Sequence, residues 1–186
     1  MFKPAFVLMA ILTLVTGLVY PLAMMGLAHM AFPARAHGSL ITENGRVTGS
    51  KLIGQQFDDP AHFWSRPSAT EPFPYNPAAS SGSNYGPRSA DLEKAMEERR
   101  KALQAADPGN TAPIPIDLLT ASGSGLDPHI SPQAAEYQAS RVARLRRLNV
   151  RVVRELIATH TENRQLGFLG EPVVNVVALN RALDRK

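Results

Sequence analysis

The chain has 186 residues, of which 44% are hydrophobic, 19% charged and 6% aromatic, and its formal net charge is +4. This length predicts one domain with at most an appendage. The basic residues are scattered and form no stripe with interleaved aromatic residues, which argues against nucleic acid as a partner. Cysteine is absent, which excludes disulfides, thiolate metal sites and a cysteine nucleophile. The five histidines include no pair at metal-ligand spacing, so no metal site is predicted.

An uncharged, apolar segment runs from Ala5 to Ala28. A helix rises about 1.5 Å per residue, so this segment reaches about 36 Å and can cross a ~30 Å hydrocarbon core. The alternative is a cleaved signal peptide, because residues 1–3 are similar to a basic n-region and residues 34–36 to a cleavage site. Signal h-regions usually span about 7 to 15 residues, fewer than here. We therefore expect a retained transmembrane helix in the lipid bilayer over residues 1–32, followed by one domain over residues 33–186.

The middle of this helix contains candidate residues for packing against another helix. Thr13 and Gly17 lie four positions apart, a spacing of small residues that lets two helices approach closely, and Tyr20 and Pro21 follow one turn later. Small residues are also common in membrane helices in general, so the alternative that Thr13 and Gly17 have no role in helix packing stays open. Pro21 lacks a backbone N–H, which membrane helices tolerate when the freed carbonyl finds other partners. The flanking charges do not fix the orientation of the helix.

The chain after residue 33 predicts a mixed α+β fold with long loops rich in Pro, Gly and Ser. An Asn44-Gly45 turn between two β-rich segments predicts a hairpin whose second arm runs towards Ile53. Residues 66–87 are irregular in composition, as in a functional loop or a linker. Aromatic residues are expected to anchor the core or to pack this loop against a surface: Phe57, Phe63, Trp64, Phe73, Tyr75 and Tyr85.

The second half of the chain predicts helices separated by short strands. Helix starts are indicated by Ser89, by Ser131 followed by Pro132, and by Asn149. The expected helices are residues 90–106, 132–148, 150–160 and 178–184, and the expected strands are residues 116–119 and 173–177.

Motifs for nucleotide or acyl chemistry are missing. The sequence has no GxxxxGK[ST] loop, no Asp-Lys-Thr-Gly phosphorylation motif, no GxSxG and no SxxK. Ser124, Asp127 and His129 lie within six positions, whereas a catalytic triad needs side chains converging from different segments. A tight turn before the helix capped by Ser131 explains them better. The same Gly/Ser loop, at the start of a helix, could also hold an anion.

Eight segments occur in a specific order along the chain. They are TGLVYPL at 16–22, GSLI at 38–41, GSKLIGQQF at 49–57, FWSRPSA at 63–69, YNPAASSGSN at 75–84, LLTASGSGLDPHISPQAA at 118–135, RVAR at 141–144 and LGEPVVNVVALNRAL at 169–183. In combination they resemble the C subunit of the Kdp high-affinity potassium-transporting ATPase. The resemblance covers most of the chain and leaves out roughly residues 88–115. Ser81 departs from the family, which more often has glycine there.

The resemblance implies a single-span protein of the bacterial plasma membrane, with a cytoplasmic N-terminus and an extracytoplasmic main domain. It implies three partners: a channel-like potassium-binding subunit, a P-type ATP-hydrolysing subunit and a small single-span subunit. The chain itself would hydrolyse no ATP and hold no covalent cofactor, and its partners would transport the potassium. Its implied role is that of a catalytic chaperone that raises the affinity of the hydrolysing subunit for ATP.

The implied topology conflicts with direct contact to ATP, because a domain outside the membrane cannot touch cytoplasmic nucleotide. Either the effect on ATP affinity is indirect, or the role is misassigned. The candidates for nucleotide contact are Ser122, Gly123, Ser124, Gly125 and Gln138. Two other classes stay open: a secreted or membrane-anchored binding module, and an anchored hydrolase that uses Ser124.

Overall fold

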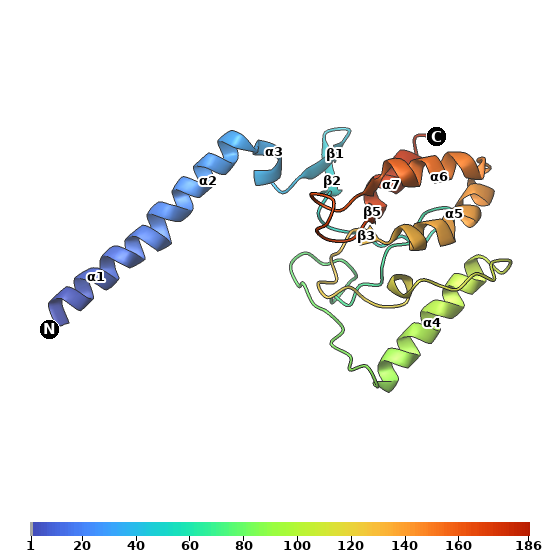
Figure 1. Ribbon diagram of the computed structural model, residues 1–186, viewed down its shortest axis with the longest axis horizontal. Helices are drawn as coiled ribbons and strands as arrows, with labels where there is room; N and C mark the ends of the chain where they lie inside the picture. The colour runs from blue at the N-terminus through green and yellow to red at the C-terminus, as the bar shows by residue number, and fades with distance from the viewer. Residues whose placement is uncertain (1) are drawn as a thin grey trace. The chain divides into compact units, whose positions relative to one another are not determined.

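The computed structural model describes residues 2–186, and the chain divides into two units, the first ending at Ser50 and the second spanning Lys51–Lys186. Most of the first unit is one apolar helix, formed by α1 (Phe2–Leu14), a π-helical turn and α2 (Tyr20–Ala31) (Figure 1). Within the 30 residues from Phe2 to Ala31, an 18-residue window reaches a mean hydropathy of 2.2, and no residue of α1 or α2 is buried. This helix is long and apolar enough to cross a membrane. The boundary predicted after residue 32 separates the transmembrane helix from the domain that follows it, whereas the two units divide after Ser50. The boundary after residue 32 stays a prediction.

The helix accommodates Pro21 through a wide turn directly before it. In the π-helical segment η1 (Val15–Val19), the backbone N–H of Tyr20 donates to Val15 O, five residues back. Proline in a helix interior removes one hydrogen bond and crowds the carbonyl four residues earlier. A π turn is a recognised way for a helix to absorb such a disturbance. The helix therefore continues through the proline without ending.

A short helix and a hairpin complete the first unit: α3 (Pro33–Ala36), β1 (Leu40–Glu43) and β2 (Arg46–Ser50). The two strands are antiparallel and pair Glu43 with Arg46. Asn44 and Gly45, at φ values of 50° and 76°, form the turn between them. Both angles suit the tight turn that Asn-Gly pairs favour, so the predicted hairpin is confirmed. Its second strand ends at Ser50, earlier than expected.

The second unit has a small antiparallel sheet with helices packed beside it (Figure 1). The strand order is β3-β5-β4, formed by β3 (His129–Ile130), β5 (Val173–Asn175) and β4 (Thr161–Glu162). Beside the sheet lie the helices α5 (Pro132–Arg146), α6 (Val150–Thr159) and α7 (Val176–Leu183); α6 contacts both α5 and α7, and these two contact β5. This mixture of helices and a small sheet confirms the predicted α+β class. The core between these elements is aliphatic and includes Ile130, Val142, Val153, Val174, Leu179 and Leu183.

Side-chain caps determine where the helices begin. Ser89 accepts a hydrogen bond from the backbone N–H of Asp91 and starts α4 (Ala90–Ala106), and Ser131 accepts from Ala134 and starts α5. Both starts agree with the sequence analysis. The last helix begins earlier than predicted, because Asn175 Oδ1 accepts from the Ala178 N–H and ends the β-rich segment at residue 175.

The predicted strand at residues 116–119 is wrong. The chain forms a 3₁₀ turn there, η2 (Ile116–Leu118), in which the Leu118 N–H donates to Pro115 O at 3.1 Å. Pro113 and Pro115 have no N–H to donate to a neighbouring strand, which disfavours a sheet at this position. Asp117 is used differently, because its carboxylate accepts the N–H of Ser131 at 2.7 Å.

Residues 51–89 contain no helix or strand, yet they enter the core through Phe63, which is fully buried. Asn180 on α7 accepts from the Phe63 N–H and donates to the Phe63 carbonyl, both at 2.9 Å. Gln138 on α5 accepts from the Trp64 N–H at 2.8 Å and donates to the Trp64 carbonyl at 3.2 Å. Two amide side chains thus satisfy the buried backbone of Phe63 and Trp64 as a neighbouring strand would.

Buried Arg141 completes this arrangement. Its Nη2 donates to Gln138 Oε1 at 2.7 Å, its Nη1 donates to Pro60 O, and its guanidinium lies 4.9 Å from the centre of the Trp64 ring. Burial lowers the pKa of Arg141 to about 10, so the side chain keeps its charge at neutral pH. Phe57 and Trp64 are partly buried against the same core, as expected for two of the anchors.

Candidate functional site

The Gly/Ser loop at residues 122–125 packs against the long irregular loop at residues 66–87. Ser124 O accepts hydrogen bonds from the Ser81 N–H and the Ser80 hydroxyl, both at 3.0 Å. The Ser68 hydroxyl donates to Gly125 O at 2.7 Å. Most of these contacts use backbone atoms. The two loops therefore form one surface, in which the small side chains of glycine and serine let the two backbones lie close together.

Glycine is required at two positions of this contact, namely Gly125 and Gly82, where a Cβ would lie 2.8 Å from Gly123 O. Gly125 has φ +66°, and a Cβ there would lie 2.5 Å from Thr70 Cγ2 and 2.7 Å from Ser81 O. Both the left-handed backbone and the lack of space exclude a side chain. Gly123, two residues earlier, has nothing within 4 Å of a Cβ. Gly125 is therefore a packing position and Gly123 is free to face solvent or a ligand.

The long loop is ordered by its own hydrogen bonds and by Tyr75. The Tyr75 side chain is 6% exposed, its hydroxyl donates to Arg66 O at 2.5 Å, and burial raises its pKa to about 12. Phe73 and Tyr85, in contrast, are 53% and 45% exposed. Of the three loop aromatics, one packs inward and two remain on the surface, where they can meet another molecule.

Ser124, Asp127 and His129 do not form a triad. The Ser124 hydroxyl accepts from the Leu126 N–H at 3.1 Å, and among the described residues no hydrogen bond joins it to His129. Asp127 Oδ1 accepts from the N–H of His129 and lies 3.2 Å from its Nδ1. Burial raises the pKa of Asp127, but the hydrogen bonds from His129 outweigh burial and leave that pKa below its usual value. Ser124, Asp127 and His129 therefore form local hydrogen bonds within the turn that precedes α5.

Gln138 lies in the core and is 1% exposed. Besides its two bonds to Trp64, its Nε2 donates to Ala134 O at 3.2 Å, and its Oε1 accepts from Arg141. Its amide therefore has protein partners on both its donor and its acceptor sides. Contact between Gln138 and a nucleotide stays a prediction, and it would require this side chain to leave its partners.

One face of the membrane-length helix is hollowed around the residues proposed for helix packing. Side chains of α1 and η1 surround a shallow groove at Thr13 and Gly17, and a Cβ at Gly17 would meet nothing within 4 Å. The other residues at this groove are Phe6, Met9, Ala10, Leu14 and Leu18. The side chains at this groove are apolar except for Thr13, so its surface suits another apolar helix.

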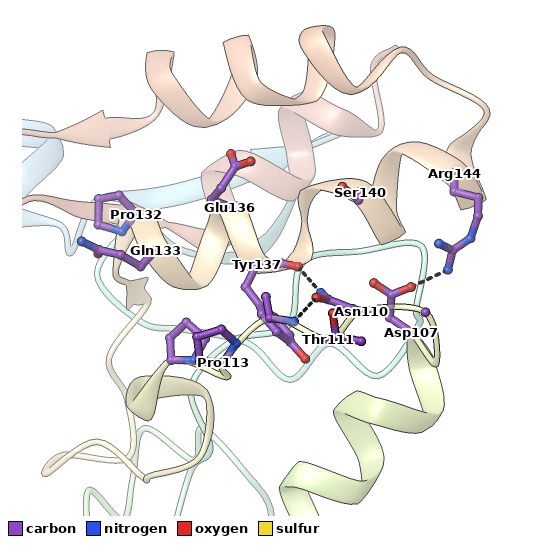
Figure 2. Close-up of a pocket in the computed structure, with 13 residues that line it drawn as sticks. Asp107, Asn110, Thr111, Pro113, Pro132, Gln133, Glu136, Tyr137, Ser140 and Arg144 are labelled. Carbon is purple, nitrogen blue, oxygen red and sulfur yellow. Dashed lines mark hydrogen bonds and ion pairs between the residues drawn. The ribbon is translucent and has the colours of Figure 1, made fainter.

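A large cavity of the second unit was missed by the sequence analysis. It has a volume of about 890 Å³ and lies between α5 and residues 107–115 (Figure 2). Asn110 holds this linker in place, because its Nδ2 donates to Tyr137 O at 2.9 Å. Arg144 Nη2 lies 2.8 Å from Asp107 Oδ1 at one end of the hollow. None of the residues predicted for nucleotide contact lines it, and the composition of the linker carries no signal for it.

Metal chemistry finds no support in the geometry. Across residues 2–186, no three His, Asp or Glu side chains come together as ligands for a metal ion.

An apolar helix of membrane-spanning length, followed by a small α+β body (Lys51–Lys186), is consistent with a single-span membrane protein. Comparison with known proteins makes this more specific. Residues 2–185 match the family model described as KdpC, the c chain of K⁺-transporting ATPase. The chain belongs to the KdpC family.

Curated relatives support the same assignment over nearly the whole chain. The chain is 60% identical to the potassium-transporting ATPase KdpC subunit of Methylococcus capsulatus, across 98% of this chain and 96% of the relative. It is 58% identical to the KdpC subunit of Sorangium cellulosum, with coverages of 98% and 96%, and 59% identical to that of Polaromonas naphthalenivorans, with coverages of 98% and 93%. The resemblance found in the sequence is therefore confirmed.

The contact between the two loops predicts different effects for two neighbouring glycines. Gly125→Ala should lower the free energy of unfolding by about 1–3 kcal/mol, because it adds backbone strain and a clash. Gly123→Ala should change it by about 0.5 kcal/mol or less, because its Cβ meets open space. Urea unfolding of the full chain in detergent measures both. Equal effects of the two substitutions would show that the loops do not pack as described.

Proposed function

We propose that the chain is a non-catalytic accessory subunit of an ATP-driven potassium uptake complex, which it helps to assemble and stabilise. The observation that carries this proposal is the family match over residues 2–185 together with relatives named as subunits of a potassium-transporting ATPase. The geometry agrees with it, since the one set of residues considered for hydrolysis is not assembled. An accessory subunit needs surfaces rather than reacting groups, and its helix groove and exposed loop aromatics supply them.

The proposed topology has the N-terminus in the cytoplasm, one retained helix in the bacterial plasma membrane and the body outside. Its support is the length and apolar character of Phe2–Ala31 and the resemblance to the family. In this topology the exposed Phe73 and Tyr85 of the long loop would face partner subunits near the potassium entrance. The partners proposed are the channel-like, the ATP-hydrolysing and the small single-span subunits.

The proposed role of catalytic chaperone requires only that the chain binds its partner subunits, without any reaction of its own. A subunit that contacts one conformational state of its partners more favourably than another shifts their equilibrium towards that state. A difference of about 1.4 kcal/mol changes an apparent affinity about tenfold, so a few contacts suffice. We therefore propose that the effect on ATP affinity is transmitted through partner subunits. Direct nucleotide contact at Ser122–Gly125 and Gln138 is the competing proposal.

Close helix packing at the groove predicts that Gly17→Leu weakens assembly. A leucine there fills the space that an approaching helix needs. Gly26→Leu is the matched control, because Gly26 also has nothing within 4 Å of a Cβ but lies outside the groove. Co-purification of the partners from membranes measures the effect, with a loss expected for Gly17→Leu only. Equal recovery with both variants would remove the groove as a contact.

An indirect effect on ATP predicts that leaving the chain out raises the KM for ATP of the remaining complex about tenfold, the equivalent of about 1.4 kcal/mol. Ser124→Ala should leave this KM unchanged, because the Ser124 hydroxyl accepts the Leu126 N–H within the local turn. ATPase assays over a range of ATP concentrations measure both. A large rise in KM for the Ser124→Ala complex would favour direct contact between the loop and the nucleotide.

The proposed orientation predicts which cysteine probes are accessible. The chain has no cysteine, so one can be introduced at a chosen place. Ala102→Cys, on the exposed side of α4, should react with a membrane-impermeant maleimide in intact spheroplasts. Lys3→Cys, at the N-terminal end of the membrane-length helix, should react only after lysis. The reverse pattern would place the body in the cytoplasm, where it could contact ATP directly.

A further inference from the structure

A second cavity, smaller than the one in Figure 2, lies elsewhere in the second unit and has a volume of about 270 Å³. It is bounded by the irregular chain around Phe57 and Trp64, by Leu103 of α4 and by Leu118 of η2. These four side chains give it apolar walls. Two cations, Arg66 and Arg99, also line it, although they come from segments far apart in the sequence. Cavities with apolar walls and a few converging polar groups are typical of small-molecule sites.

Arg66 has hydrogen-bonding capacity that the protein does not use. Its two terminal nitrogens reach Asp127 Oδ2 and Ala121 O at 3.4 Å each, which is long for hydrogen bonds. Its Nε is buried and has no hydrogen-bond partner, the single such side-chain atom found in residues 2–186. A buried donor without a partner is energetically costly, so Arg66 would gain a hydrogen bond by turning its Nε towards an acceptor in the cavity.

Arg99 is half-buried and differs from Arg66, whose Nη1 lies 3.4 Å from Asp127 Oδ2, in having no acidic side chain as a partner among the described residues. Its Nη1 donates to Leu119 O at 2.8 Å, and in the described part of the chain it forms no ion pair. Desolvation by burial lowers the pKa of Arg99 from its usual value. Arg100, the next residue on α4, differs in both respects, because it is exposed and lies 2.6 Å from Glu97 Oε2. The two neighbouring arginines therefore serve different purposes.

One carboxylate also lines the cavity. Asp58 is exposed, and its Oδ1 accepts from Gln56 Nε2 at 2.6 Å. Its charge is shielded by water and offsets that of Arg99 only in part, while Arg66 is already paired with Asp127. Because Asp58 would repel an anion at the mouth of the cavity, its removal should improve anion binding.

The geometry points to this cavity as a binding site for a small organic carboxylate with an apolar body. Guanidinium groups pair with the planar carboxylate through two parallel hydrogen bonds, a geometry that suits Arg66 and Arg99. The aromatic and aliphatic walls suit an apolar ring or chain. The cavity volume of about 270 Å³ is sufficient for a molecule as small as benzoate. An inorganic anion would leave the apolar walls in contact with water.

The experiment uses Trp64, the chain's single tryptophan, as its reporter. Titration of the full chain in detergent with benzoate should change the fluorescence of Trp64 in a saturable way and shift its indole N–H resonance. Benzamide has the same shape without the charge and should bind at least about tenfold more weakly, since it loses the charge-assisted hydrogen bonds to the guanidinium groups. No saturable change with benzoate, or equal binding of benzamide, would overturn the proposal.

Three variants test the residues without depending on any one of them folding. Arg99→Gln should weaken benzoate binding about tenfold, and Arg100→Gln should leave it unchanged. Asp58→Asn should strengthen it about threefold, the size expected when one exposed charge is removed near a site. Circular dichroism of each variant shows that the fold is retained. An equal loss of binding for Arg99→Gln and Arg100→Gln would show that the anion does not use the cavity.

Discussion

The pairing of Phe63 and Trp64 with two side-chain amides is the interaction on which the body of the protein depends. The strands of the body's own sheet are two or three residues long, and they offer few edges for the irregular chain to join. Buried backbone groups must nevertheless be satisfied. Asn180 and Gln138 do this from two different helices, each with one donor and one acceptor. The place of the long loop relative to α5 and α7 follows from these four hydrogen bonds.

The same region shows why a Gly/Ser-rich segment is ambiguous. Backbone that approaches an anion closely and backbone that approaches another loop closely both need residues with little or no side chain. In this fold Gly125 and Ser124 meet residues 68–82, and the carbonyls of both accept hydrogen bonds from that loop. Close packing explains the composition of Ser122–Gly125 without a ligand, and it leaves Gly123 as the open position of the segment.

Two kinds of surface fit the work of a subunit that acts by binding. The groove at Thr13 and Gly17 offers an apolar helix face in a segment of membrane-spanning length, while Phe73 and Tyr85 offer aromatic contacts on an ordered loop. The cavity at Arg66 and Arg99 adds a third kind, suited to a small anion. Arg66 Nη1 also lies 3.4 Å from Asp127 Oδ2, in the turn before α5. A ligand that binds Arg66 in this cavity would therefore also affect that turn.

The sequence by itself determined the features that depend on near neighbours. The membrane-length helix follows from an unbroken apolar run, the hairpin from the positive φ that Asn44 and Gly45 tolerate, and the starts of α4 and α5 from the side chains of Ser89 and Ser131. Each of these signals lies within one continuous stretch of the chain, and sequence patterns report such local signals well. The ordered set of short motifs was also sufficient to recognise the family.

Only the tertiary structure decided which polar residues serve the core and which remain available. Gln138 and Asn180 lie 74 and 117 positions from the backbone groups that they satisfy, and nothing local distinguishes them from surface amides. Likewise, Arg99 and Arg100 are adjacent and chemically identical, yet one turns into a cavity and the other pairs with Glu97. The orientation of a helix against distant chain assigns these roles, because burial and unmet hydrogen bonds arise only when such segments pack together.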